Sequence, residues 1–531
     1  MTIAKRVLAE ALKAMLHDGA ELALLDVREA GQFGESHLLF ATPLPYSRLE
    51  IDISALVPRK SARIVLCDDG VAGVAALAAR RLDTIGYRDI AVLEGGTRAW
   101  ASAGYALFAG VNVPSKLFGE LVEHEYHTPR ITVAELARMK TQGDDFIVVD
   151  GRPFSEYQKM NIPGGICCPN AELPYRIREI VKNPKTKIIV NCAGRTRSIL
   201  GAQTLINFGV SNPVYALENG TQGWVLADFE LERGASRRYP DRVDESALPA
   251  LRSQAQTLMA RHGAGRVDAA TLDAWLREAH RTTFLLDVRT PEEFNAGSIR
   301  GAVHAPGGQL IQATDQWVGI RNARIVLIDS EGVRAPVVAS WLKQLGCDAY
   351  VLENGIRADV KAPAPTAPAL PMLPTLSPAE LKHALDERAC TVFDLGSSMS
   401  FRKAHVPGSR WSIRSRLVQD AQSAKRPIVL VAADVNVARV AAIDLLEAGI
   451  NDVKLLKDGL AAWSAAGYPT DASPAVPEDG ACIDYLFFVH DRHAGNREAM
   501  KQYLAWETGL IAQLDAQDRK AFRVGAVQER Q

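Results

Sequence analysis

The chain has 531 residues, 47% of them hydrophobic, which is enough for several independent cores because a single core stops growing near about 250 to 300 residues. Its 61 basic and 62 acidic residues leave a net charge of -1, which excludes a global electrostatic attraction to nucleic acid or to a membrane surface. No apolar run approaches the roughly 18 residues that span a bilayer. Seven cysteines without regular spacing argue against a disulfide framework, so we expect a cytoplasmic protein with free thiols.

The first elements along the chain set a pattern. Residues 1–19 predict an amphipathic helix that lacks the apolar core and cleavage site of a signal peptide. An apolar run then ends at Asp26 in LLDVREAGQF, a second one forms RIVLCDDG, and a third, AVL, leads into EGGTRAW. Helical stretches separate these predicted strands, and Gly86 follows the last helix, where a C-cap glycine is expected.

The same landmarks return three more times. The first reappears as VVDGRPFSEY, LLDVRTPEEF and VFDLGSSMSF, the second as KIIVNCAG, RIVLIDSEG and PIVLVAAD, and the third as ENGTQGW, ENGIRAD and KDGLAAW. Apolar strands that alternate with helices of about three turns predict a parallel sheet with helices on both faces. We therefore expect four tandem α/β domains of about 100 residues each.

Changes in composition mark the boundaries between the repeats. The stretch KAPAPTAPALPMLPTLSP predicts a semi-rigid spacer before the fourth repeat. After Pro469 we predict a turn and one long amphipathic helix that packs against the rest without taking part in chemistry. The predicted organisation is 1–110 for domain 1, 111–236 for a connector and domain 2, 237–360 for domain 3, 361–473 for the proline-rich linker and domain 4, and 474–531 for a C-terminal helical tail.

One loop of the second repeat carries the residues of a reactive site. Open α/β sheets bind ligands beyond the carboxyl ends of their strands, where loop amides and the helix dipole favour an anion. Cys192 lies there, in NCAGRTRS, and the flanking Arg195 and Arg197 are expected to stabilise its thiolate. Gly194 is expected to let the backbone curl so that the amides converge on one group. A buried, inert thiol is the alternative, but it would gain nothing from two neighbouring arginines.

These motifs resemble the rhodanese-like sulfurtransferases over nearly the whole chain. In the second repeat the resemblance rests on D-x-R, IPGG, the strand followed by a cysteine and a loop with arginine, and ENG-x-x-x-W. It implies four tandem rhodanese-like domains and thiosulfate sulfurtransferase activity, with a six-residue loop that cradles a persulfide. That loop is Cys192, Ala193, Gly194, Arg195, Thr196 and Arg197. The family usually has glycine three residues after the cysteine, whereas here Gly194 comes two after it and Arg195 takes the third place.

The resemblance also implies a reaction. The thiolate of Cys192 would attack the outer sulfur of thiosulfate, and cyanide or a thiol would then remove that sulfur from the persulfide. Arg195 and Arg197 would neutralise the charge of the donor, and Arg152 would be a further substrate ligand. A glutathione persulfide is the alternative donor to thiosulfate. We expect no metal or organic cofactor. The expected partners are a small-molecule sulfur donor and a thiophilic acceptor, without nucleic acid or membrane, and a homodimer is the candidate assembly.

Two rival functions stay open. Cysteine-dependent phosphatases resemble this site but need five residues between cysteine and arginine, a position that falls on Ser198, since Arg197 is one residue short. A non-catalytic sulfur relay or interaction scaffold would load one sulfur and stall, whereas an enzyme would turn over thiosulfate and cyanide.

Only the second repeat is expected to be active. Alignment of the strands places Asp68, Asp329 and approximately Ala432 where the second repeat has Cys192, and an aspartate cannot carry sulfur. Cys67 falls one residue earlier and is expected to point into the fold.

Other residues near the loop allow two interpretations each. Arg176 and Arg178 would line the mouth of the pocket or, as we favour, lie on a solvated helix face. Cys167 and Cys168 would act as resolving thiols or, as we favour, lie buried in a strand. The Asp150 and Arg152 pair recurs in repeats without the cysteine, so a structural use is at least as well supported as a functional one.

Overall fold

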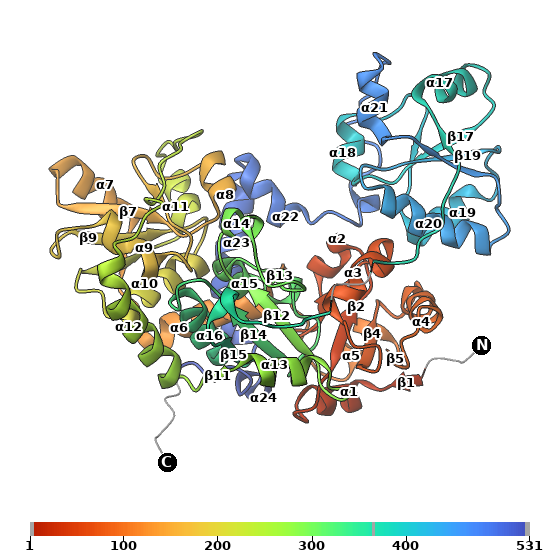
Figure 1. The fold of residues 1–531 in the computed structure, drawn as a ribbon. Coiled ribbons are helices and arrows are strands. Elements are labelled where there is room, and N and C mark those ends of the chain that lie inside the picture. The colour runs from red at the N-terminus through yellow and green to blue at the C-terminus, as the bar shows by residue number, and fades with distance from the viewer. Residues whose placement is uncertain (1–4, 364–366, 526–531) are drawn as a thin grey trace. The chain divides into compact units, whose positions relative to one another are not determined.

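Four sheets of five parallel strands follow one another along the chain (Figure 1). The computed structural model describes residues 5–363 and 367–525. In every sheet the strands lie in the order first, fifth, fourth, second, third, so each repeat closes its own sheet before the next begins. The predicted α/β class and the four-fold repetition are confirmed. Each repeat has two strands of only two or three residues that the sequence patterns missed, since so short a run carries no periodicity.

The first and fourth repeats belong to one compact unit, residues 1–14, 23–110 and 365–487. The first repeat consists of β1 (Lys5–Val7), α1 (Ala9–Leu16), β2 (Ala23–Asp26), α2 (Ala30–Glu35), β3 (Thr42–Pro43), α3 (Leu49–Leu56), β4 (Arg63–Cys67), α4 (Val74–Thr84), β5 (Asp89–Leu93) and α5 (Gly96–Ser102). The single helix expected over 1–19 is wrong in part, because β1 pairs with β5 before α1 begins.

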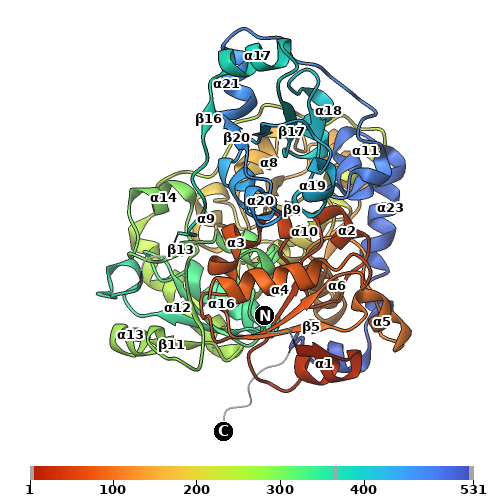
Figure 2. The same ribbon diagram turned by 90° about the vertical axis from the view of Figure 1, so that its right-hand side faces the viewer.

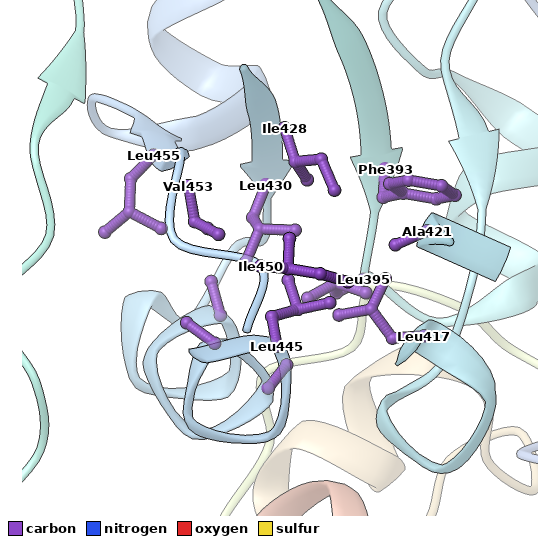
Figure 3. Close-up of a cluster of buried hydrophobic side chains, with 13 residues drawn as sticks. Phe393, Leu395, Leu417, Ala421, Ile428, Leu430, Leu445, Ile450, Val453 and Leu455 are labelled. Carbon is purple, nitrogen blue, oxygen red and sulfur yellow. The ribbon is translucent and has the colours of Figure 1, made fainter. Parts of the chain in front are cut away.

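The fourth repeat has the same layout around an aliphatic core. It consists of β16 (Thr375–Leu376), α17 (Pro378–Asp386), β17 (Thr391–Asp394), α18 (Ser398–Lys403), β18 (Arg410–Trp411), α19 (Arg414–Ala421), β19 (Ile428–Val431), α20 (Val435–Glu447), β20 (Val453–Leu456) and α21 (Gly459–Ala465). Figure 3 shows one face of this core, where Leu430 and Val453 of the sheet point toward Leu417 and Leu445 of the covering helices. Part of the predicted proline-rich spacer, 364–366, lies outside the described residues.

The second and third repeats and the tail from residue 488 onward belong to the other unit, residues 15–22, 111–364 and 488–531. The second repeat follows α6 (Val113–Tyr126) and consists of β6 (Arg130–Ile131), α7 (Val133–Gln142), β7 (Phe146–Asp150), α8 (Phe154–Lys159), β8 (Ile166–Cys167), α9 (Leu173–Ile180), β9 (Lys187–Asn191), α10 (Thr196–Phe208), β10 (Val214–Leu217) and α11 (Gly220–Leu226). The third repeat follows α12 (Leu248–Arg261) and consists of β11 (Gly265–Val267), α13 (Ala269–Leu276), β12 (Thr283–Asp287), α14 (Pro291–Ala296), β13 (Val303–His304), α15 (Gly307–Gln312), β14 (Arg324–Ile328), α16 (Arg334–Gln344) and β15 (Asp348–Leu352).

The tail differs from its prediction. Instead of one long helix it forms α22 (Phe487–His490), α23 (Arg497–Thr508) and α24 (Ala516–Arg519), separated by turns. The longest of the three, α23, begins where the side chain of Asn496 accepts hydrogen bonds from the amides of Glu498 and Ala499.

A repeated glycine fixes the register between the loops of all four domains. Gly96, Gly220, Gly355 and Gly459 each have a positive φ, between 51° and 60°. A Cβ atom on any of them would lie within 2.6 Å of a backbone carbonyl oxygen, so only glycine fits. The four carbonyls belong to Asp68, Cys192, Asp329 and Ala432. The predicted alignment of these four positions is therefore confirmed.

In the part of the chain that the structure describes, none of the helices combines the length and the apolar character that crossing a membrane requires.

Candidate active site

Cys192 lies at the carboxyl end of the second sheet, between β9 and α10. Its backbone carbonyl accepts a hydrogen bond of 2.9 Å from the amide of Thr221, next to the glycine that abuts it. The side chain is only 2% exposed. Its thiol donates to the hydroxyl oxygen of Ser198 at 3.5 Å, and that hydroxyl in turn donates to the carbonyl of Arg195 at 2.8 Å. The fold thus holds the sulfur inside its own loop.

The amides that follow the cysteine have no protein acceptor. Among the residues that the structure describes, none accepts a hydrogen bond from the backbone N–H groups of 193–198. These N–H groups lie at the N-terminus of α10, so the helix dipole adds to their positive potential. Buried N–H groups of a helix N-terminus form a site for an anion or a polarisable sulfur. The loop therefore offers open amides at the position where the sequence predicts an amide cradle, and their convergence on the sulfur stays a prediction.

In the first and third domains, an aspartate of the equivalent loop accepts hydrogen bonds from the loop amides. The carboxylate of Asp329 accepts hydrogen bonds from the amides of Gly332, Val333 and Ala335 at 2.9 to 3.0 Å. In the first domain the carboxylate of Asp68 accepts from two amides, those of Gly70 and Ala75. In both loops an aspartate side chain accepts hydrogen bonds from the loop amides, whereas the loop of the second domain offers no such acceptor among the described residues.

The side chain of Arg195 is paired with two glutamates. Its guanidinium donates to both carboxylate oxygens of Glu120 at 2.8 and 2.9 Å and to Glu123 at 2.5 Å. It is 6% exposed, and both glutamates belong to α6. Two carboxylates offset its charge, so the geometry favours a role in anchoring the loop rather than the predicted role of neutralising a donor.

Arg197 is a loop cation that interacts electrostatically with Cys192. Its guanidinium forms two hydrogen bonds of 2.8 Å with Glu156 and a longer one with Gln309. Burial works to lower the pKa of Arg197, but Glu156 and the sulfur of Cys192 outweigh it, so the pKa lies above its usual range. Arg197 is therefore charged and close enough to Cys192 to interact with it.

The Asp150 and Arg152 pair has the same contacts in three domains. Arg152 donates to both oxygens of Asp150 and to the carbonyl of Met160, and it is 2% exposed. Arg28 and Arg289 make the equivalent contacts in domains without the cysteine. This pattern is that of a structural pair that fixes the turn after the strand, and the predicted contact of Arg152 with substrate stays a prediction.

Neither interpretation of Arg176 is correct. Its guanidinium is buried, where it bonds Glu172 at 2.8 Å and the carbonyls of Pro240 and Asp241 at 3.0 Å. The spacing of a single helix could not show that the segment after the domain folds back over it. Arg178 is exposed, as favoured, and bonds Gln254.

The other cysteines near the loop are buried, as favoured for them. Burial raises the pKa of the Cys167 thiol to about 12 and raises that of Cys168 well above its usual range. Cys67 is fully buried at the end of β4, as predicted, and burial raises its pKa as well. None of these three thiols has the ionisation that a nucleophile needs at neutral pH.

The sequence missed the partners of the loop. Glu120 and Glu123 lie in α6, which was treated as a connector, and Glu507 lies in α23, which was treated as packing alone. Glu507 accepts a hydrogen bond of 2.7 Å from the hydroxyl of Thr196. The sequence around Glu120 and Glu123 offers one local signal, since the two glutamates lie about one helical turn apart in α6.

Comparison with known proteins agrees with this geometry. A family model, described as the rhodanese-like domain, matches residues 8–103, 132–227, 268–362 and 377–466, which together make up more than half of the chain. The chain belongs to the rhodanese family. The structure of a thiosulfate sulfurtransferase from Pseudomonas aeruginosa is 42% identical to this rhodanese, covers 99% of it and 100% of its own chain, and superposes with a TM-score of 0.91.

A curated relative shares a shorter region with this rhodanese. The HTH-type transcriptional regulator Rv0324 of Mycobacterium tuberculosis is 34% identical over 111 residues. The match spans 21% of this chain and 48% of that regulator, so the two share about one domain.

Proposed function

We propose that this protein is a thiosulfate sulfurtransferase that carries the transferred sulfur as a persulfide on Cys192. The observation that carries the proposal is the open amide cradle of 193–198 around one cysteine, in a chain whose other described loops hold aspartate or alanine at that place. Membership of the rhodanese family and the similarity to a sulfurtransferase over nearly the whole chain support sulfurtransferase activity.

The first half-reaction moves one sulfur to the enzyme. The thiolate of Cys192 attacks the outer sulfur of thiosulfate, the sulfur–sulfur bond of the donor breaks, and sulfite leaves with the bonding electron pair. The amides of 193–198 would stabilise the negative terminal sulfur of the persulfide, and Arg197 would attract the dianionic donor. The hydroxyl of Ser198, 3.5 Å from the sulfur of Cys192, can donate to the thiolate once the thiol has lost its proton.

The second half-reaction returns the enzyme to its starting state. Cyanide, or the thiolate of a thiol acceptor, attacks the terminal sulfur, and the sulfur–sulfur bond breaks toward Cys192, which leaves as a thiolate. The products are thiocyanate or an acceptor persulfide, and no electrons are gained or lost overall. Such a double displacement predicts ping-pong kinetics.

Ser198 argues against the phosphatase alternative. A phosphatase loop would need an arginine here, whereas Ser198 is fully buried and its hydroxyl lies 2.8 Å from the carbonyl of Arg195 and 3.3 Å from that of Leu217.

Intact mass after incubation with thiosulfate tests the proposal, with thiocyanate release followed in parallel. The wild type should gain one sulfur and lose it on addition of cyanide, while Cys192→Ser should gain none. Cys167→Ser is the matched control, because it removes a buried thiol from the same domain. Loading of one sulfur without repeated thiocyanate release would support a sulfur relay instead, and an adduct that persists in Cys192→Ser would overturn the assignment of Cys192.

A further inference from the structure

The outer side of the Cys192 loop is covered by two helices that lie outside the family match. These are α6, before residue 132, and α23, after residue 466. Helix α23 contacts α6 and α11, and Figure 2 shows it running beside them. Arg497 at its start donates to the carbonyls of Val225 and Leu226 and so caps the C-terminus of α11. The tail is thus tied to the domain that carries the cysteine.

Glu507 near the end of α23 reaches the loop itself. One carboxylate oxygen accepts hydrogen bonds from the hydroxyl of Thr196 at 2.7 Å and from the ammonium of Lys116 at 3.1 Å. The residue is 0% exposed. Among the described residues its other oxygen has no hydrogen-bond partner, and it lies 3.1 Å from the place where a Cβ on Gly194 would be. A Cβ at this position would therefore be in tight contact with the buried carboxylate, which favours glycine there.

The third domain shows what the loop looks like without this contact. Where the second domain has Gly194 and Thr196, the third has Glu331 and Val333. Glu331 folds onto Arg334 within its own loop, and valine has no hydroxyl to donate. Gly194 and Thr196, the two loop residues that contact Glu507, are thus replaced in the third domain by residues that could not make these contacts. This also accounts for the glycine that comes two residues after the cysteine.

The charges around Glu507 explain how it can stay ionised in the interior. Burial works to raise its pKa, but Lys116, the Thr196 hydroxyl and Arg492 outweigh it, so the pKa lies below its usual range. Lys116 is 8% exposed and lies over the ring of Tyr503. That ring lies 3.4 Å from the place where a Cβ on Gly194 would be. A carboxylate with these fixed partners is a rigid attachment point.

We propose that Glu507 is a positioning residue, which holds the Cys192 loop in its sulfur-binding shape through Thr196 and Gly194. The proposal rests on the proposed function for its kinetic consequence, but its structural consequence is independent of that function. Loop amides that converge on one sulfur must keep their geometry, since a displacement of 1 Å costs about a hundredfold in rate. The tail, far from the cysteine in sequence, therefore belongs to the active site.

Hydrogen exchange and steady-state kinetics on the full chain test the proposal together. Thr196→Val removes the hydroxyl but leaves the Lys116 and Glu507 ion pair in place, so it avoids an unpaired buried charge. Glu507→Ala removes the whole contact, and Glu507→Gln keeps an acceptor for the hydroxyl. Glu498→Gln is the matched control, because Glu498 is exposed on the same helix and its side chain pairs only with Lys501, at 3.6 Å, among the described residues.

In Thr196→Val and Glu507→Ala the amides of Ile199, Thr221 and Gln222, which donate to carbonyls of the loop, should exchange at least about fivefold faster. In both variants kcat should fall about tenfold or more, with a smaller change in KM for thiosulfate. Glu507→Gln should recover most of kcat relative to Glu507→Ala, and Glu498→Gln should match the wild type in both readouts. The melting temperature of each variant identifies any that fail to fold, in which case Thr196→Val decides the test.

Unchanged exchange in Thr196→Val and Glu507→Ala would overturn the proposal, as would faster exchange with an unchanged kcat. If the wild type shows no sulfur transfer, the proposed function fails but the exchange rates still decide whether Glu507 holds the loop.

Discussion

The loops at Cys192 and at Asp329 share one frame and differ in what fills it. Both follow the strand that pairs with the D-x-R strand, and both abut a positive-φ glycine, Gly220 or Gly355. Five residues on, Arg197 and Arg334 each bind the equivalent glutamate of the helix that follows the D-x-R strand. The difference is that the amides of the third domain are bonded to Asp329, whereas those after Cys192 are open.

Under the proposed function, this comparison means that a domain can lose activity without losing its fold. Asp329 accepts hydrogen bonds from three amides of its loop, so the third domain keeps a satisfied loop. In the cysteine loop the N–H groups have no hydrogen-bond partner among the described residues, which under the proposed function is the cost of keeping a cradle available for a ligand. Activity and local stability are thus opposed at this one position.

Cys192→Asp should break the comparison most strongly. Its carboxylate should accept hydrogen bonds from the loop amides as that of Asp329 does, so the melting temperature should be equal to or above that of the wild type. Sulfur transfer should fall at least about a thousandfold because the nucleophile is gone. Steady-state thiocyanate release and thermal unfolding measure the two effects. A clear loss of stability would show that the two loops are not equivalent in shape.

Arg197→Ala should have the next largest effect on activity. It removes a cation that interacts with Cys192, so kcat/KM for thiosulfate should fall about a hundredfold. Initial rates over a range of thiosulfate concentrations measure it. Wild-type kinetics in this variant would mean that the Arg197 and Glu156 pair is structural, as its counterpart in the third domain is.

Arg334→Ala is the matched control for Arg197→Ala. Arg334 is fully buried and paired with Glu172, Glu293 and Glu331. Its loss should lower the free energy of unfolding by about 3 to 5 kcal/mol, because buried carboxylates lose their partner. Denaturant unfolding checks this, and an effect confined to kinetics would contradict the structural role.

Asp329→Ala should sharpen the comparison from the other side. Three loop amides would lose their acceptor, which should destabilise the protein by about 1 to 3 kcal/mol. Sulfur transfer should stay at the wild-type rate, since no carrier is removed. Thermal unfolding of this variant beside Asp329→Asn, which keeps the shape and one acceptor oxygen, measures the contribution of the charge. An unchanged melting temperature would mean that water serves these amides equally well.

The repeat made most of the fold predictable, and contacts distant in sequence made part of the site unpredictable. The landmarks gave the four sheets, the aligned loop positions and the burial of Cys67, because glycine and apolar patterns act locally. They could not show that Arg195 points to Glu120, that the chain folds back over Arg176, or that Glu507 reaches Thr196. Those contacts join residues 64 to 311 positions apart, and nothing in a local pattern encodes them.

The smallest effect is expected for Cys167→Ala and Cys168→Ala, which test whether Cys192 is the carrier by itself. Both thiols are at most 1% exposed, and the Cys167 thiol donates to the carbonyl of Arg152. With a pKa raised to about 12, Cys167 stays protonated at pH 8 and cannot attack a donor. Each substitution should cost about 1 kcal/mol in stability through the lost packing. Intact mass should still show one added sulfur after thiosulfate. Loss of that sulfur in a variant with an unchanged melting temperature would move a step of the transfer to the substituted thiol, and the contrast between an open cradle and a filled one would then no longer account for why one domain is active.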